Sequence, residues 1–284
     1  MTVDEKLAAI LAAIQTDPGN RGLAELFAYC PGDFAAACRQ IAGNRDVVAI
    51  STGFFIPTAT PPAFETDGPL GAIFIQRALL GCNIHSLIYV AEPEVSRPID
   101  SVRDMCDLPV VDVGPEGWSH LIAIERSGPG ADGRHYTMRG RDITEYHNSE
   151  FTRCLRTRPG QCTIGIGDGG NEIGMGKIPH DIVARNIPNG DLIHCRVPTD
   201  HLIVAGVSNW GAYALAAGIY VLRGIKPPRD LFDPDREREI LEVMVKHGPL
   251  VDGVTGKQTA TVDGLSWEEY AKPLIRLREI LALA

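Results

Sequence analysis

The chain has 284 residues, of which 44% are hydrophobic and 22% charged, and its formal net charge is −9. This is the composition of a globular protein and excludes a long disordered or low-complexity chain. The acidic balance, without a segment where Lys and Arg gather among aromatic residues, disfavours nucleic acid as a partner and favours cations and small amphoteric ligands.

The predicted elements begin with an amphipathic helix over residues 3–16, where leucine and isoleucine recur at helical spacing. Short apolar strands and helices then alternate. We predict strands at 47–50, 87–90 and 110–113, and helices at 70–82, 99–106 and 118–125, the first of these with Pro69 in its first turn. Strands that alternate with helices favour a parallel sheet covered by helices on both faces.

The second half of the chain interrupts this alternation and then resumes it. Residues 132–144 are predicted to form a hairpin or an inserted loop. Further strands are expected at 162–166, 192–195 and 202–205, with helices from about 171, and at 209–222, 235–245 and 267–283. We therefore predict one α/β domain over residues 1–284, with a mostly parallel sheet, helices on both faces, an inserted hairpin region, an N-terminal helical segment (1–20) and mostly helical C-terminal additions (225–284).

Several classes of protein are disfavoured by local patterns. Residues 203–222 are uncharged over a membrane-spanning length of ~20 residues, but Gly206, Ser208 and Asn209 interrupt them, which favours a buried strand, a turn and a buried helix. The N-terminus resembles neither a secretory signal nor a transit peptide, so a cytoplasmic location is expected. The seven cysteines lack a C-x-x-C pair, which favours reduced, mostly buried thiols without a catalytic role.

The most informative segment is TIGIGDGGNEIGMG, residues 163–176. It satisfies G-x-G-x-x-G after an apolar strand, but Asp168 and Glu172 would place two carboxylates against a dinucleotide pyrophosphate. The same pair suits a hard divalent cation, Mg²⁺ or Mn²⁺, better than it suits zinc. Capping of a helix by these acids is the alternative. We predict a metal and substrate site here, in which Gly167, Gly169, Gly170 and Asn171 approach the ligand.

Other acids are expected at the same edge of the sheet. Glu65 and Asp67 lie in a turn that opens the helix at 70–82 and are candidate catalytic acids, although Thr66 or Asp67 as a helix cap is the alternative. Glu125 is predicted to end a helix, where a carboxylate opposes the helix dipole, and so is a candidate catalytic acid. Asn209 is a candidate ligand donor, with Ser208 as the N-cap of its helix, and Asp252 is a candidate further metal ligand.

Six segments together resemble the D-glutamate cyclase family, in its C-terminal domain and its stand-alone prokaryotic relatives. They are STGF (51–54), ETDGPLGA (65–72), the region 124–144 with DGRHYTMRGRDIT, IGIGDGGNEIGMG (164–176), SNWGAYAL (208–215) and DGVTG (252–256). The resemblance implies dehydration of D-glutamate to 5-oxo-D-proline, and the reverse reaction.

For this reaction we expect a divalent ion on Asp168 and Glu172 to polarise the substrate carboxylate, and Glu125 or Glu65 to carry protons. A metal-dependent phosphohydrolase is the main alternative, with Lys177, Arg21 or Lys257 as the cation for the phosphate. A small-ligand-binding module without turnover is a second alternative. The sequence leaves open whether the protein is a homo-oligomer.

Overall fold

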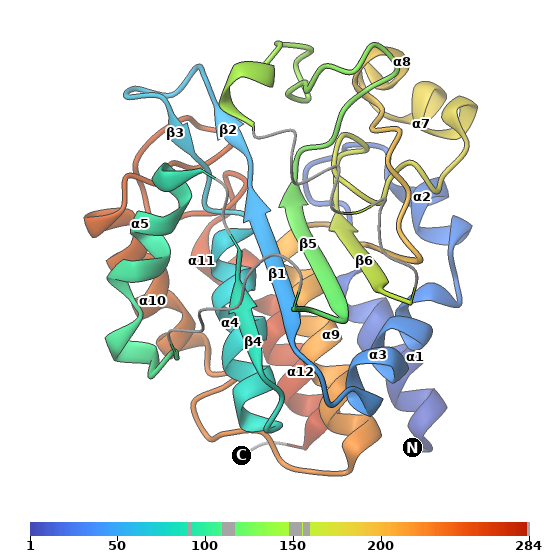
Figure 1. Cartoon of the computed structure of the whole chain (residues 1–284), viewed down its shortest axis with the longest axis vertical. Helices are drawn as coiled ribbons and strands as arrows, with labels where there is room; N and C mark the ends of the chain where they lie inside the picture. The colour runs from blue at the N-terminus through green and yellow to red at the C-terminus, as the bar shows by residue number, and fades with distance from the viewer. Residues whose placement is uncertain (90–91, 110–116, 148–154, 156–159, 283–284) are drawn as a thin grey trace.

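A parallel five-stranded sheet forms the centre of the structure, a computed structural model that describes residues 1–89, 92–109, 117–147, 155 and 160–282 (Figure 1). The strand order is β4-β1-β5-β6-β7. The strands are β1 (Val48–Gly53), β4 (Ser86–Ile88), β5 (His120–Arg126), β6 (Cys162–Gly167) and β7 (His201–Val204). A short antiparallel ribbon, β2 (Phe55–Ile56) with β3 (Ala63–Phe64), follows β1.

The strand order reverses direction at β1. The next sheet strand along the chain, β4, pairs with one side of β1, whereas β5 pairs with its other side. The loops that leave β1 and β5 therefore separate at their carboxyl ends, and open α/β sheets bind ligands in the crevice that such a reversal creates. The topology alone thus points to this edge as the place of a ligand site.

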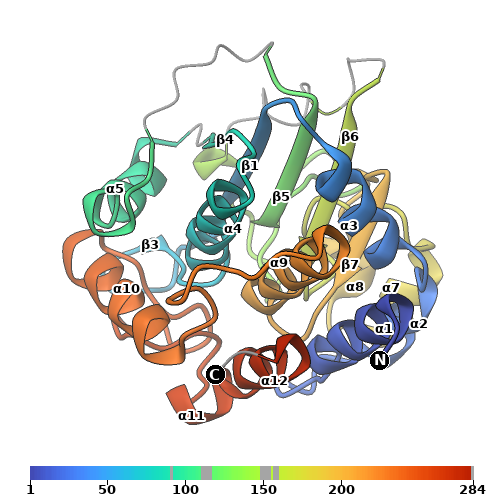
Figure 2. The ribbon, with the colours of Figure 1, turned by 90° about the horizontal axis from the view of Figure 1, so that it is seen from below.

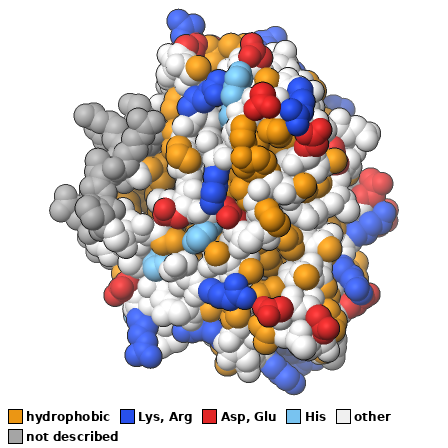
Figure 3. All heavy atoms as spheres, turned by 90° about the vertical axis from the view of Figure 1, so that its right-hand side faces the viewer, with side chains coloured by type: hydrophobic (Ala, Val, Ile, Leu, Met, Phe, Trp, Pro, Cys, Tyr) orange, Lys and Arg blue, Asp and Glu red, His pale blue; other side chains and the backbone are white. Residues whose placement is uncertain are grey.

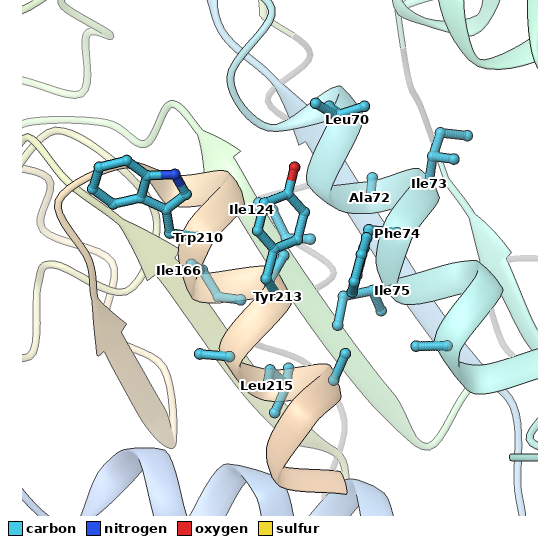
Figure 4. Packing of buried hydrophobic residues seen from close by; sticks show 14 of the residues in the cluster. Leu70, Ala72, Ile73, Phe74, Ile75, Ile124, Ile166, Trp210, Tyr213 and Leu215 are labelled. Atoms are coloured by element: carbon cyan, nitrogen blue, oxygen red, sulfur yellow. The ribbon is translucent and has the colours of Figure 1, made fainter. Parts of the chain in front are cut away.

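One face of the sheet is covered by α4 (Pro69–Gly81), α9 (Ser208–Arg223) and α3 (Asp33–Gly43); in Figure 2, α9 lies below β5 and β6, with α4 on its left and α3 on its right. Helices α4 and α9 pack side by side, with Phe74 and Tyr213 meeting over Ile124 and Ile166 of the sheet (Figure 4). Both helices are buried over most of their length, which explains the continuous apolar runs in their sequences. Helices α1 (Val3–Ile14) and α12 (Lys272–Leu281) form an outer layer against α9.

The opposite face of the sheet packs against shorter and less regular segments. Helices α2 (Ala24–Tyr29) and α7 (His180–Asn186) contribute to this second core, together with the turn that follows β6. Side chains alternate between the two cores along the strands, with Ile122 and Ile124 on one face and Leu121 and Ala123 on the other. Because both faces are buried, the middle of each strand is mostly apolar, and charged residues appear only at the carboxyl end of β5.

The remaining helices lie at the margins of the sheet. Helix α5 (Pro93–Ser101) packs against α10 (Pro234–His247), and α8 (Gly190–Ile193) packs on α7. Helix α11 (Trp267–Tyr270) directly precedes α12. The described residues also form two 3-10 turns, η1 (Asp104–Cys106) and η2 (Thr144–Tyr146). On the face seen in Figure 3, acidic and basic side chains are interspersed rather than gathered by sign. None of the described helices has the length and apolarity needed to cross a membrane.

The α/β class and its mostly parallel sheet are confirmed, but four local predictions are wrong. Residues 118–125 were expected to be a helix and form strand β5, because a short central strand buried on both faces lacks the alternation that distinguishes it from a helix. Residues 192–195 were expected to be a strand, but α8 ends there, with Leu192 exposed. The helix expected at 99–106 begins earlier, as α5, and is interrupted before η1. The helix expected from 171 is absent, as described below.

Two other expectations meet the structure only in part. The region 132–144 is an irregular loop with a single antiparallel bridge between Tyr136 and Asp142, as an inserted hairpin region would be. The strand predicted at 110–113 falls outside the described residues, as does the end of the one predicted at 87–90. The six described cysteines are free thiols, four of them buried.

Candidate active site

A cavity of about 330 Å³ opens at the carboxyl ends of β1, β5 and β6. Its buried part is acidic and its exposed part carries two arginines. The buried lining includes Glu65, Glu125, Asp168 and Asn171. The volume is at the lower end of the ~300–1,000 Å³ typical of small-molecule sites. The cavity therefore suits a small ligand, and the predicted acids Glu65, Glu125 and Asp168 do converge on it.

The glycine-rich segment after β6 forms a compact turn instead of a helix. The helix expected from Asn171 is absent, and the next helix, α7, begins only at His180. Glu172 explains the difference, because its carboxylate folds back to accept the Asp168 amide at 3.2 Å and the Gly170 amide at 2.8 Å. Gly170 has a φ of +93°, a left-handed conformation that favours glycine. A helix N-terminus that could receive a pyrophosphate is thus missing from residues 168–179.

The predicted substrate-binding glycines support this turn rather than line the cavity. A Cβ on Gly167 would lie 3.0 Å from the Glu172 Cβ, and one on Gly169 would lie 2.7 Å from the Met138 sulfur. Asn171 does line the cavity, where its amide nitrogen donates to the Tyr136 carbonyl at 2.8 Å. Its Oδ1 is buried without a partner among the described residues. Of this group, Asn171 is the side chain available to a ligand.

Glu125 lies at the end of strand β5 rather than at the end of a helix. Its φ is +43°, an uncommon conformation for a residue with a side chain, next to the register shift between β1 and β5. The Ser208 hydroxyl donates to its Oε2 at 2.6 Å. Ser208 was expected to cap α9; instead it is the first residue of that helix and holds the Glu125 carboxylate in place.

Asp67 and Asn209 cap each other's helices. The Asp67 carboxylate accepts the Ser208 and Asn209 amides, each at 2.8 Å, at the start of α9. Asn209 Oδ1 in turn accepts the Gly68 amide at 2.9 Å and the Gly71 amide at 2.7 Å, at the start of α4. Both residues are buried, and neither lines the cavity. The structure thus gives Asn209 a structural role in place of the expected ligand contact, and Asp67 caps α9 rather than α4.

Two residues of the cavity were missed as parts of an acidic site. Arg21 lies on the loop after α1, and its guanidinium contacts Asp168 at 2.5 Å and Asp263 at 2.9 Å. Asp17 shapes this loop by accepting the amides of residues 21, 22 and 23. The sequence had suggested Arg21 only as a phosphate ligand. Asp263 sits in a D-G turn between Val262 and Leu265, and such a dipeptide normally signals nothing beyond the turn.

Asp252 was predicted to bind metal, but the structure engages it within its own loop. Its Oδ1 accepts the amides of Val254 and Thr255, and its Oδ2 accepts the Thr261 hydroxyl and the Gly264 amide, all within 3.0 Å. The side chain is fully buried and does not line the cavity. Asp252 therefore orders the loop that carries Asp263.

Burial and mutual repulsion favour the protonated form of the acids in and next to the cavity. Burial raises the pKa of Asp168 to about 6, although Arg21 opposes the shift, and burial raises the pKa of Asp263 to about 7 in the same way. Burial and neighbouring carboxylates raise the pKa of Glu65, Asp67 and Glu125 well above the usual range. The cavity can therefore hold protons near neutral pH and exchange them with a ligand.

Two overlapping groups of carboxylates have the spacing of a cation site. Asp67, Asp168 and Asp263 can each bring an oxygen within 4.8 Å of the others, and so can Glu125, Asp168 and Glu172. Asp168 belongs to both groups, and its Oδ2 is buried without a hydrogen-bond partner among the described residues. Hard oxygen ligands of this kind fit Mg²⁺ or Mn²⁺.

Comparison with known proteins places this geometry in a family. A family described as D-glutamate cyclase-like, C-terminal, matches residues 10–278. The chain is also similar to the human protein named D-glutamate cyclase, mitochondrial, with 29% identity over 97% of this chain. It spans about half of that relative, 52% of its length. The match over nearly all of the chain includes every acid of the cavity, and the protein therefore belongs to the D-glutamate cyclase-like, C-terminal family.

Proposed function

We propose that this protein is a hydro-lyase that interconverts D-glutamate and 5-oxo-D-proline in the acidic cavity, with a divalent ion bound by its carboxylates. The observation that carries the proposal is the convergence of Glu65, Glu125 and Asp168 on one buried pocket, in a chain of this family. The name of the human relative indicates this reaction for that longer protein. Assigning it to the half that this chain represents is our inference.

The chemistry requires protons to move within the site. The α-nitrogen of D-glutamate forms a bond to the side-chain carboxyl carbon, and one oxygen leaves as water. The ammonium loses two protons and the departing oxygen gains two, so the site carries protons but supplies none overall. Buried carboxyls whose pKa is raised suit this relay, because they hold a proton more tightly than ordinary carboxylates do and can act as acids as well as bases.

Glu125 is the better placed of the two proton carriers. It lines the cavity at the carboxyl end of a central strand, and the Ser208 hydroxyl fixes one of its oxygens at 2.6 Å. Glu65 also lines the cavity and contacts the loop at Gly253. We assign the ammonium to this buried acidic part, because Asp168, whose pKa of about 6 leaves it ionised at neutral pH, attracts a cation more strongly where it is buried than an exposed carboxylate does.

The carboxylate groups also fit a hard divalent ion, which supports the metal part of the proposal. Asp168 would be its central ligand, with an oxygen that lacks another partner and lies within reach of both groups. A bound ion would supply Lewis-acid polarisation of the substrate carboxyl. Arg21 already neutralises part of the charge on Asp168 and Asp263, so we expect ion binding to compete with this contact.

The direct test is turnover by the pure protein. D-Glutamate and 5-oxo-D-proline should interconvert in the presence of Mn²⁺ or Mg²⁺, followed by chromatography of both compounds. Glu125→Gln should slow the reaction by ~10²–10⁴, the usual cost of losing a positioned proton carrier. Glu65→Gln is the matched comparison, since it tells which acid moves the proton. Absence of turnover by the wild-type protein in both directions, with either ion, would refute the assignment.

Metal binding is tested separately from turnover. Calorimetric titration of metal-stripped protein with Mn²⁺ should show binding that Asp168→Asn and Glu172→Gln each weaken. Asp4→Asn is the control of the same charge change, because Asp4 lies on α1, is 84% exposed and does not line the cavity. Equal affinity in wild type, Asp168→Asn and Glu172→Gln would contradict the metal site. If phosphate esters were hydrolysed instead of D-glutamate, the phosphohydrolase alternative would replace the proposal.

A further inference from the structure

The exposed part of the cavity carries a short hairpin, residues 136–142, that presents Arg139 and Arg141. We name it the arginine hairpin. Tyr136 and Asp142 bridge its two sides, and the Thr137 amide donates to the Arg141 carbonyl at 2.9 Å. Gly140 closes the turn with a φ of +73°. Both arginine side chains line the cavity, although both residues are exposed overall.

The arginine hairpin is held firmly against the acidic part of the site. The Asn171 amide donates to the Tyr136 carbonyl at 2.8 Å, and the Asn189 amide donates to the Met138 carbonyl at 2.9 Å. Arg139 also donates to the Val254 carbonyl at 3.2 Å, across the cavity. The hairpin is therefore tied to the glycine-rich turn, to the start of α8 and to the loop 252–256, which fixes the position of its cations.

Arg139 and Arg141 differ from Arg21 in whether carboxylates contact their guanidinium groups. Arg21 contacts two carboxylates and is 16% exposed. Arg139 contacts only a carbonyl, and the Arg141 guanidinium has no hydrogen bond or ion pair with any described residue. Two cations without anionic partners thus border a pocket whose interior is acidic. A guanidinium in this state binds carboxylates well, because its fork of donors matches the two oxygens.

We propose that Arg141 and Arg139 form a carboxylate-binding subsite that recognises the α-carboxylate of the substrate and product. This rests on the proposed function, and it specifies the orientation in the pocket: the ammonium points inward to the acids, and the α-carboxylate points outward to the arginines. The α-carboxylate takes no part in the bond changes and is present in both D-glutamate and 5-oxo-D-proline. The subsite therefore binds both sides of the equilibrium and discriminates against amines or lactams without this group.

The test uses a pair of lactams that differ only in this group. 5-Oxo-D-proline carries the carboxylate, and 2-pyrrolidinone is the same ring without it. Calorimetry with wild-type protein should show preferential binding of 5-oxo-D-proline. Arg141→Met should weaken that binding about tenfold, the loss of one charge-assisted interaction, and Arg139→Met/Arg141→Met should remove the preference. Binding of 2-pyrrolidinone should stay as it was. With D-glutamate, KM should rise more than kcat falls.

Arg134→Met is the matched control, because Arg134 lies in the same loop, is 62% exposed and does not line the cavity. It should keep the preference for 5-oxo-D-proline. The inference is overturned if wild-type protein binds the two lactams equally, if it fails to bind 5-oxo-D-proline, or if the double variant keeps the preference. A protein that shows the preference but no turnover would support the subsite and refute only the proposed reaction.

Discussion

Replacing Asn209 with alanine should destabilise the whole fold, because this side chain joins the two central helices. Asn209 Oδ1 accepts the Gly68 and Gly71 amides at 2.9 and 2.7 Å, and its Nδ2 donates to the Thr66 carbonyl at 3.3 Å. The side chain is fully buried, so neither amide has water as a substitute. Asn209→Ala leaves the Gly71 amide without an acceptor, whereas the Gly68 amide keeps Asp67 Oδ1 at 3.0 Å.

The magnitude follows from the burial of these amides. A buried donor that loses its partner costs ~1–3 kcal/mol, and this range applies to the Gly71 amide alone, because the Gly68 amide keeps a second acceptor. Part of this free energy is recovered if α4 shifts, or if a water molecule enters the space that the Asn209 side chain leaves. Loss of an N-cap alone costs ~0.5–2 kcal/mol. We therefore expect the free energy of unfolding to fall by ~1–3 kcal/mol for Asn209→Ala.

The assay is urea unfolding followed by circular dichroism, with the urea midpoint and slope compared among variants. Thr2→Ala is the control, because Thr2 caps α1 at an exposed site, where its hydroxyl accepts the Glu5 amide at 3.2 Å. It should cost ~1 kcal/mol or less. If Asn209→Ala costs no more than Thr2→Ala, with an unchanged slope, the reciprocal cap does not stabilise the packing of α4 on α9.

Three further predictions concern the site. Burial raises the pKa of Asp168 to about 6 and that of Asp263 to about 7, so a bound ion must displace their protons as the pH falls. The affinity for Mn²⁺ should therefore fall roughly 10- to 100-fold from pH 7.5 to pH 5.5. Calorimetric titrations that give the same affinity at both pH values would contradict this. Arg21 lowers the pKa of both acids, so Arg21→Met should raise both values. The variant should lose more free energy of unfolding at pH 8, where the wild-type acids are ionised, than at pH 5. If urea unfolding showed a larger loss of free energy at pH 5, the result would be inconsistent with the ion pairs. Burial raises the pKa of the thiols of Cys106 and Cys162 to about 11, so mild alkylation that preserves the circular dichroism spectrum should leave turnover intact, and its loss would implicate a thiol.

The sequence predicted well those elements whose hydrophobic residues recur with a clear period, or whose ends are marked by residues that start or stop a helix. Helix α4 was expected at 70–82 and spans Pro69–Gly81, because a proline starts it and a polar turn follows. Strand β5 was misread, because a central strand buried on both faces has no alternation of polar and apolar residues. Residues 171–177 were misread because the Glu172 carboxylate satisfies nearby amides that a helix would otherwise use.

The site was predicted where its residues follow strands, and missed where tertiary contacts create it. Glu65 and Asp168 were found because acids after buried strands converge at one edge of a parallel sheet, whereas Glu125 was proposed from the wrong premise that it ends a helix. Asp263 is brought in by a turn that carries no functional motif. The structural role of Asn209 was hidden as well, because the Gly68 and Gly71 amides that donate to it lie at the start of another helix. Such pairings depend on how α4 and α9 pack, as Figure 4 shows, and no local pattern encodes them.

The contact between Arg21 and Asp263 joins segments near opposite ends of the described chain. During synthesis the sheet strands and α9 are all made before residue 263, so the central layers can assemble while the cavity still lacks one wall. In that interval Arg21 has Asp168 as its partner but not Asp263. A fragment that stops before residue 263 would keep the sheet, α4 and α9, and so most of its secondary structure, but it would lack α11, α12 and the complete site. Ligand binding, rather than circular dichroism, is the measurement that distinguishes a finished molecule from such a fragment.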